Sequence, residues 1–132
     1  MWIMTPYGFF SIVQVSPTDP NLLQIRARDR AHLVALRKAA MVKLPGITTT
    51  GGTDYPYRIK TTRELVGQIM IDLVIDIDYL NFKEEAHRVS PKDRPFHNFL
   101  MRVWSLGREM MPGSSGRNAR RYNEKRDNFF LE

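Results

Sequence analysis

The stretch LLQIRAR, residues 22–28, alternates apolar and polar side chains. Successive side chains of a β-strand point to opposite faces of the sheet, so this spacing predicts a half-buried strand. Its apolar positions are Leu23, Ile25 and Ala27, and its polar positions are Gln24, Arg26 and Arg28. A strand with one covered and one wet face is typical of antiparallel sheets.

Residues before this strand predict its neighbours. Residues 9–15, FFSIVQV, are aromatic and β-branched, as in strands, and residues 2–4 form a shorter apolar run. Residues 5–8 contain Pro and Gly as a turn requires, and residues 16–21 form a breaker cluster with two prolines. The first 28 residues therefore predict a meander of two or three antiparallel strands.

The segment after residue 28 predicts a helix, a loop and another strand. Asp29 can cap a helix over residues 30–42, and basic residues fall near its end, where the helix dipole favours cations. Residues 45–53 are rich in Gly and Thr and predict a loop. Residues 55–60 alternate again, but Pro56 cannot donate to a ladder, so this strand begins there or lies at an edge.

The remaining chain predicts two amphipathic helices. Thr61 and Glu64 have capping-box spacing, and apolar residues then recur every three or four positions up to Ile77. That stripe comprises Leu65, Val66, Ile69, Leu73, Val74 and Ile77. A second stripe predicts a helix over residues 95–110. Its apolar side chains, with the aromatic residues between the two helices, are expected to form core; they include Tyr79, Phe82, Phe96, Phe99 and Trp104.

The predicted order is strand-strand-strand-helix-strand-helix-helix. We expect an α+β fold in which a small antiparallel sheet of three or four strands carries helices on one face. A ferredoxin-like variant would satisfy the same order. Residues 1–111 are expected to form a single domain, followed by a basic tail over residues 112–132 that is flexible or docked on a partner.

Charge is distributed unevenly along the chain. The net charge is +6, with six basic and two acidic side chains in residues 1–50, nine of each in 51–111, and five against three in 112–132. A basic surplus favours acidic partners such as nucleic acid or an acidic protein. With no cysteine, no long apolar run and no signal-peptide pattern, the chain is expected to work in the cytoplasm and not at a membrane.

Two basic regions are candidate binding surfaces. If helices cover the apolar sheet face, the opposite face presents cations beside Tyr7 and Phe9, as in sheets that stack single-stranded RNA. These cations are Arg26, Arg28, Arg58 and Lys60. The tail adds Arg117, Arg120, Arg121, Lys125 and Arg126, and it ends in a potential anchor of Phe129, Phe130 and Leu131. A solvated polar face and a solubilising tail are the alternatives in each case.

Catalytic and metal-binding patterns are weaker. Asp72 and Asp76 lie one turn apart, near Asp78 and the pair Glu84 and Glu85, but amphipathicity alone accounts for a polar helix face. His32, His87 and His97 lack metal-ligand spacing. We therefore expect no catalytic residue, no metal and no cofactor.

Five short segments resemble an uncharacterised family of short bacterial and phage-borne proteins. They are Trp2–Thr5, Gly8–Ser11, Tyr55–Ile59, Asp78–Lys83 and Val103–Trp104. The resemblance covers about residues 1–106 and ends before the tail. It implies no catalytic residues, and it implies a mobile-element setting in which small proteins bind and block host machinery.

The function expected from these patterns is non-enzymatic binding of nucleic acid or a nucleoprotein complex through the basic face and tail. A phage-type inhibitor of a host defence complex is one concrete version. The first alternative is a protein-interaction or structural subunit anchored by its tail. The second is a small metal-dependent nuclease or hydrolase that uses Asp72, Asp76 or a histidine.

Overall fold

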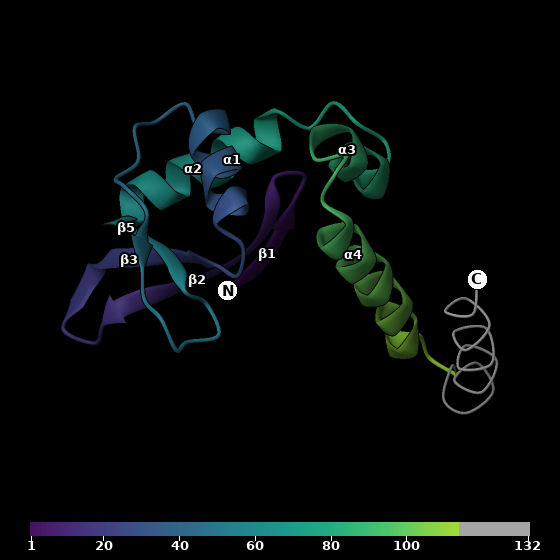
Figure 1. The fold of residues 1–132 in the computed structure, drawn as a ribbon, viewed down its shortest axis with the longest axis horizontal. Coiled ribbons are helices and arrows are strands. Elements are labelled where there is room, and N and C mark those ends of the chain that lie inside the picture. The colour runs from purple at the N-terminus through teal and green to yellow at the C-terminus, as the bar shows by residue number, and fades with distance from the viewer. Residues whose placement is uncertain (114–132) are drawn as a thin grey trace. The chain divides into compact units, whose positions relative to one another are not determined.

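The computed structural model describes residues 1–113 and shows an α+β fold with a five-stranded antiparallel sheet (Figure 1). The strands are β1 (Trp2–Thr5), β2 (Gly8–Ser16), β3 (Asp19–Ala27), β4 (Thr48–Thr49) and β5 (Tyr57–Thr62). The helices are α1 (Arg30–Ala39), α2 (Arg63–Ile75), α3 (Phe82–Val89) and α4 (Arg94–Gly107), followed by a 3₁₀ turn, η1 (Arg108–Met110). The predicted fold class is confirmed.

The sheet has the strand order β1-β2-β3-β5-β4. The alternating strand β3 lies at its centre and pairs antiparallel with β2 and with β5. The short strand β4, which falls within the predicted loop, covers the outer edge of β5. Pro56 therefore comes directly before a strand that pairs with β3 on one side and with β4 on the other. Of the two interpretations of the sequence, a strand start at Pro56 and an edge strand, the first is correct.

Two helix starts show how local capping works here. Asp29 caps α1 as expected, because its side chain accepts a hydrogen bond from the Ala31 N–H. The cap of α2 is Thr62, whose hydroxyl accepts from the Leu65 N–H, and not Thr61 as the capping-box spacing predicted. Thr61 is the buried partner of Leu23 in the β3–β5 ladder, so its side chain belongs to the sheet.

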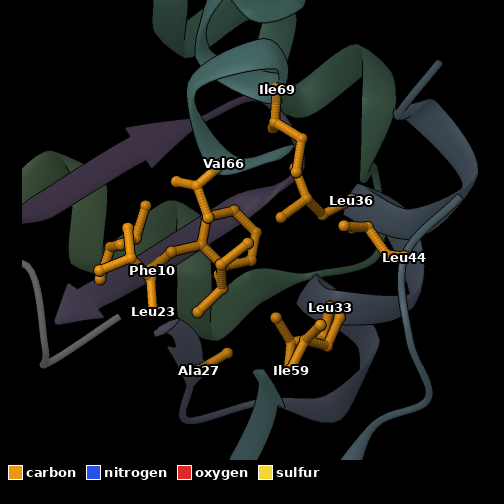
Figure 2. Packing of buried hydrophobic residues seen from close by; sticks show 11 residues of the cluster. Phe10, Leu23, Ala27, Leu33, Leu36, Leu44, Ile59, Val66 and Ile69 are labelled. Carbon is orange, nitrogen blue, oxygen red and sulfur yellow. The ribbon is translucent and has the colours of Figure 1, made fainter. Parts of the chain in front are cut away.

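The core lies between the sheet and the helices α1 and α2, which lie over one face of the sheet (Figure 1). Ile25 and Ile59 are register partners and both are fully buried. In Figure 2 the side chains of Val66 and Ile69 point from α2 into the cluster formed by the sheet residues. The apolar alternation of β3 thus fixes which sheet face the helices cover.

The expected apolar stripe of α2 is only partly core. Val66 and Ile69 are buried, whereas Val74 is 68% exposed and Ile77 is 53% exposed. Leu73, one turn after Ile69, still packs against the core cluster. At about 100° per residue, Val74 lies roughly 140° round the helix from Ile69, and Ile77 follows the end of α2. The prediction of core was wrong for Trp104 as well, whose side chain is 52% exposed on α4.

The chain divides into two compact units. Residues Met1–Phe96 form the first, which contains the whole sheet, and the second begins at His97. Within residues 1–113, no helix has both the length and the apolar character needed to cross a bilayer.

Candidate nucleic-acid interface

The strands carry a second face, opposite α1 and α2, which we call the open face. Because Ile25 and Ile59 point into the core, the residues that alternate with them point away from the helices. On β3 and β5 these include all of the cations that the sequence singled out within the strands. The structure therefore brings the predicted sheet cations to one side, while Tyr7, expected beside them, packs against the core cluster instead.

Register places like charges next to one another on the open face. Arg26 lies directly opposite Arg58, and Gln24 lies opposite Lys60. Like charges opposite each other in a sheet are destabilising, so this arrangement costs folding free energy unless other groups offset it. Among the strands of the described residues, Asp19 at the start of β3 is the sole acidic side chain, so no strand neighbour neutralises the pair.

The four cations differ in how accessible they are. Arg28 and Lys60 are exposed. Arg26 is partly buried, and its Nη2 donates to Ser11 Oγ at 2.7 Å. Arg58 is also partly buried, and its Nε donates to the carbonyl oxygen of Tyr55 at 3.1 Å. Internal bonds thus hold the guanidinium groups of Arg26 and Arg58 in place, while Arg28 and Lys60 are exposed.

Aromatic rings lie among these cations. The guanidinium carbons of Arg26 and Arg28 are 4.8 and 4.3 Å from the Tyr55 ring centroid. Arg28 also lies 5.7 Å from the Phe9 ring, and Phe9 meets Trp2 edge to face at 5.9 Å. These distances are within the range of cation–π and aromatic pairing. We call these five residues the arginine–aromatic cluster.

Within residues 1–113, three buried polar atoms of this region have no hydrogen-bond partner: Gln24 Oε1, Arg26 Nε and Tyr55 Oη. Gln24 is 8% exposed and Tyr55 is 3% exposed. An unsatisfied buried polar group costs about 1–3 kcal/mol, and most folded proteins contain few of them. Their concentration beside the open-face arginines marks a place where the sequence does not maximise stability.

A second polar constellation joins α1 to the segment before α4. His32 Nε2 lies 2.7 Å from Asp93 Oδ2, and the imidazole is tilted by 60° against the Phe96 ring with centroids 4.9 Å apart. His32 Nδ1 accepts a hydrogen bond from the Phe9 N–H at 3.4 Å. Asp93 also accepts from the Phe96 N–H through Oδ1, so one carboxylate caps a helix and holds the imidazole.

Asp29, His32 and Asp93 are also a candidate metal-ligand group, because one ligand atom from each lies within 4.8 Å of the others. Both ring nitrogens of His32 have protein partners, the Phe9 N–H at Nδ1 and the Asp93 carboxylate at Nε2. The arrangement performs a structural role in linking distant segments.

Asp72 and Asp76, the acidic residues considered for a nuclease or hydrolase site, lie at the end of α2. Asp72 accepts a hydrogen bond from Gln68, and Asp76 is the C-cap of α2. Among the described residues, neither belongs to a group of three or more potential metal ligands. Glu85 pairs with Arg88 on α3, and the hydrogen bond from that guanidinium lowers the pKa of the Glu85 carboxyl below its ordinary value.

Sequence reasoning missed two members of the arginine–aromatic cluster and one separate contact. Trp2 and Tyr55 had not been assigned to the basic face, and the His32–Asp93 pair had no signal in residue spacing. Trp2 could have been found only with the strand register, which aligns it with Ser11 and, through β2, with Arg26. The predicted tail residues, which are Arg117, Arg120, Arg121, Lys125, Arg126, Phe129, Phe130 and Leu131, lie outside the described residues.

Comparison with protein-family models, with curated proteins and with solved structures found no match for this chain.

Proposed function

We propose that this protein is a non-enzymatic binding protein that engages nucleic acid, free or in a nucleoprotein complex, through the open face of its sheet. The observation that carries the proposal is the pairing of Arg26 with Arg58 across β3 and β5, beside the exposed Lys60. Guanidinium groups match phosphate oxygens in charge and in bidentate geometry. A phosphate backbone on this face would offset the repulsion between the paired arginines.

The placement of the cations on a rigid scaffold supports the same proposal. Arg26 and Arg58 are held by Ser11 and by the Tyr55 carbonyl, so they lose little side-chain entropy when they bind. Exposed Arg28 and Lys60 extend the charge along β3 and β5. A phage-type inhibitor acting on a host defence complex in the cytoplasm is one setting in which such a surface would work.

The proposal is tested by fluorescence anisotropy with labelled RNA and DNA oligonucleotides over a series of NaCl concentrations. We expect affinity to fall with salt, because each phosphate contact releases condensed counterions. The double variant Arg28→Ala/Lys60→Ala should weaken binding and lower the salt slope by about 1 to 1.5 units. Both side chains are exposed, so the fold should survive their removal.

The matched control is Lys38→Ala/Lys43→Ala, which removes the same charge from exposed positions outside the strands. It should leave the salt slope near that of the wild type. Binding that does not depend on salt, or an equal loss in the two double variants, would contradict the proposal, because the charge would then act without regard to its place on the sheet.

A further inference from the structure

We infer that the open face takes single-stranded nucleic acid, RNA or DNA, with an unpaired base stacked on the indole of Trp2. This inference rests on the function proposed above and names the form of nucleic acid that the surface would select. Phosphate contacts alone do not distinguish a duplex from a single strand. The distinction comes from the aromatic groups next to the cations.

Trp2 is the most exposed ring of the arginine–aromatic cluster. Its side chain is 72% exposed, although an indole is among the largest apolar groups a fold can bury. It is not at a frayed end, because Trp2 pairs with Ser11 and the residue before it exchanges two hydrogen bonds with Ile12, each of 2.8 Å. Trp2 and Phe9 form a T-shaped pair with an interplanar angle of 76°. The indole is thus presented on an ordered strand.

One register row connects this ring to the phosphate-binding side chains. Trp2 on β1 pairs with Ser11 on β2, Ser11 with Arg26 on β3, and Arg26 with Arg58 on β5. Partners in register share a face of the sheet, so the row begins at an exposed indole and ends at two arginines. Three strand spacings of about 4.8 Å span roughly 14 Å, a distance that a few nucleotides can cover.

The rest of the cluster fits an unpaired strand better than a duplex. Arg28 lies over both Phe9 and Tyr55, so its planar group extends the aromatic surface toward β5. Base faces are accessible only where bases are unpaired, and proteins that bind single strands combine a basic track with such stacking surfaces. A duplex hides those faces and would leave Trp2 in water.

The unpartnered polar atoms are a second, independent observation at the same place. Gln24 Oε1 is an acceptor, Tyr55 Oη can donate or accept, and Arg26 Nε is a donor. All three are buried and have no hydrogen-bond partner among the described residues. Base edges and ribose hydroxyls can supply the missing bonds once the side chains that cover these atoms move aside. Their presence beside the stacking rings favours recognition of bases as well as phosphates.

The experiment compares full-length wild type, Trp2→Ala and Trp104→Ala on labelled oligo(dT) and oligo(U) of about 15 nucleotides, and on a duplex of equal length. Trp104 is the matched control, because it is also an exposed tryptophan, 52% accessible, and lies on α4 away from the strands in sequence. We expect the wild type to prefer the single strands. Trp2→Ala should lose roughly 5- to 150-fold in single-strand affinity with an unchanged salt slope, and Trp104→Ala should bind as the wild type does.

The variant Trp2→Phe keeps a ring and should retain most of the affinity, which separates stacking from any loss of fold. In a Trp104→Phe background the remaining indole should be quenched when oligo(dT) binds. Equal binding of duplex and single strand, or an unaffected Trp2→Ala variant, overturns the inference. The proposed function still stands in that case if binding depends on salt and on Arg28 and Lys60. Absence of binding to every oligonucleotide overturns both. The oligo(dT) and oligo(U) arms tell whether the surface distinguishes DNA from RNA.

Discussion

His32 Nε2 and Asp93 Oδ2 lie 2.7 Å apart although 61 residues separate them in the chain. The bond ties α1 to the start of α4, and its second half is the hydrogen bond from the Phe9 N–H to His32 Nδ1. Each polar atom of the imidazole therefore has one partner from a different part of the first compact unit. Such a satisfied buried network restricts the fold to one arrangement.

Removing the carboxylate at position 93 should destabilise the protein strongly. Asp93→Ala deletes the partner of His32 and also the cap of the Phe96 N–H, so we expect a loss of about 2–4 kcal/mol in the free energy of unfolding. Urea denaturation followed by circular dichroism measures it. Asp54→Ala, at an exposed loop position, should stay within about 0.5 kcal/mol of wild type. Similar losses in the two variants would mean that the buried pair contributes nothing special.

A methyl group at position 8 should displace His32. A Cβ built on Gly8 would lie 2.3 Å from His32 Cγ, and the Gly8 φ of +148° is rarely adopted by other residues. We expect Gly8→Ala to cost at least about 2 kcal/mol. Gly46→Ala, where a Cβ meets no atom within 4 Å, should be neutral or slightly stabilising in the same thermal melts. If Gly8→Ala and Gly46→Ala had the same melting temperature, the close packing of Gly8 against His32 would be refuted.

The cap of α2 can be identified by substitution. Thr62→Ala removes the hydroxyl that accepts from the Leu65 N–H, so unfolding should become easier by about 1 kcal/mol. Thr62→Ser keeps the acceptor and should restore most of that stability. Chemical denaturation distinguishes the three proteins. If serine were no better than alanine, the hydroxyl would not be the capping group.

Buried and exposed apolar positions of α2 should respond differently to truncation. Ile69 is 1% exposed and packs in the core, so Ile69→Ala should cost about 2–5 kcal/mol. Val74 is 68% exposed, and Val74→Ala should change stability by no more than about 0.5 kcal/mol. Differential scanning calorimetry on both variants provides the comparison. A large cost at Val74 would show that its side chain is covered in solution.

The Glu85–Arg88 pair gives a small, signed dependence on pH. The hydrogen bond from Arg88 lowers the pKa of Glu85 from 4.5, so its stabilising contribution is present above that value and is lost as the pH falls below it. Glu85→Gln should therefore reduce the stability difference between about pH 7 and about pH 3. Because Arg88 is 72% exposed on α3, the effect should be slight and screened by salt. Glu84→Gln, its neighbour, is the control, and an equal change in both variants would argue against the pair.

Some of the fold could be predicted from local pattern. The alternation of residues 22–28 predicted a half-buried strand, and the structure makes this segment the central strand β3. Asp29 was identified as a helix cap because capping depends on residues within one turn of each other. In both cases the signal and the structural feature occupy the same short segment.

Other interpretations failed where packing decides between equal patterns. Thr61 and Thr62 are adjacent and both can cap, but Thr61 is taken by the sheet as the partner of Leu23. Val74 belongs to the predicted apolar stripe of α2, but at about 100° per residue it lies roughly 140° round the helix from Ile69 and is 68% exposed. The stripe drawn from sequence spacing is thus wider than the face that packs on the core.

By itself the sequence determined the fold class, the covered face of β3 and the presence of cations on its other face, because a strand's alternation fixes which residues share a side. Only the tertiary structure decided that Arg26 faces Arg58, that Trp2 joins their row, and that His32 meets Asp93. Register and long-range contact depend on how separate strands and helices pack together. The free energy that selects one register and one set of long-range contacts comes from the whole core and is not contained in any one segment.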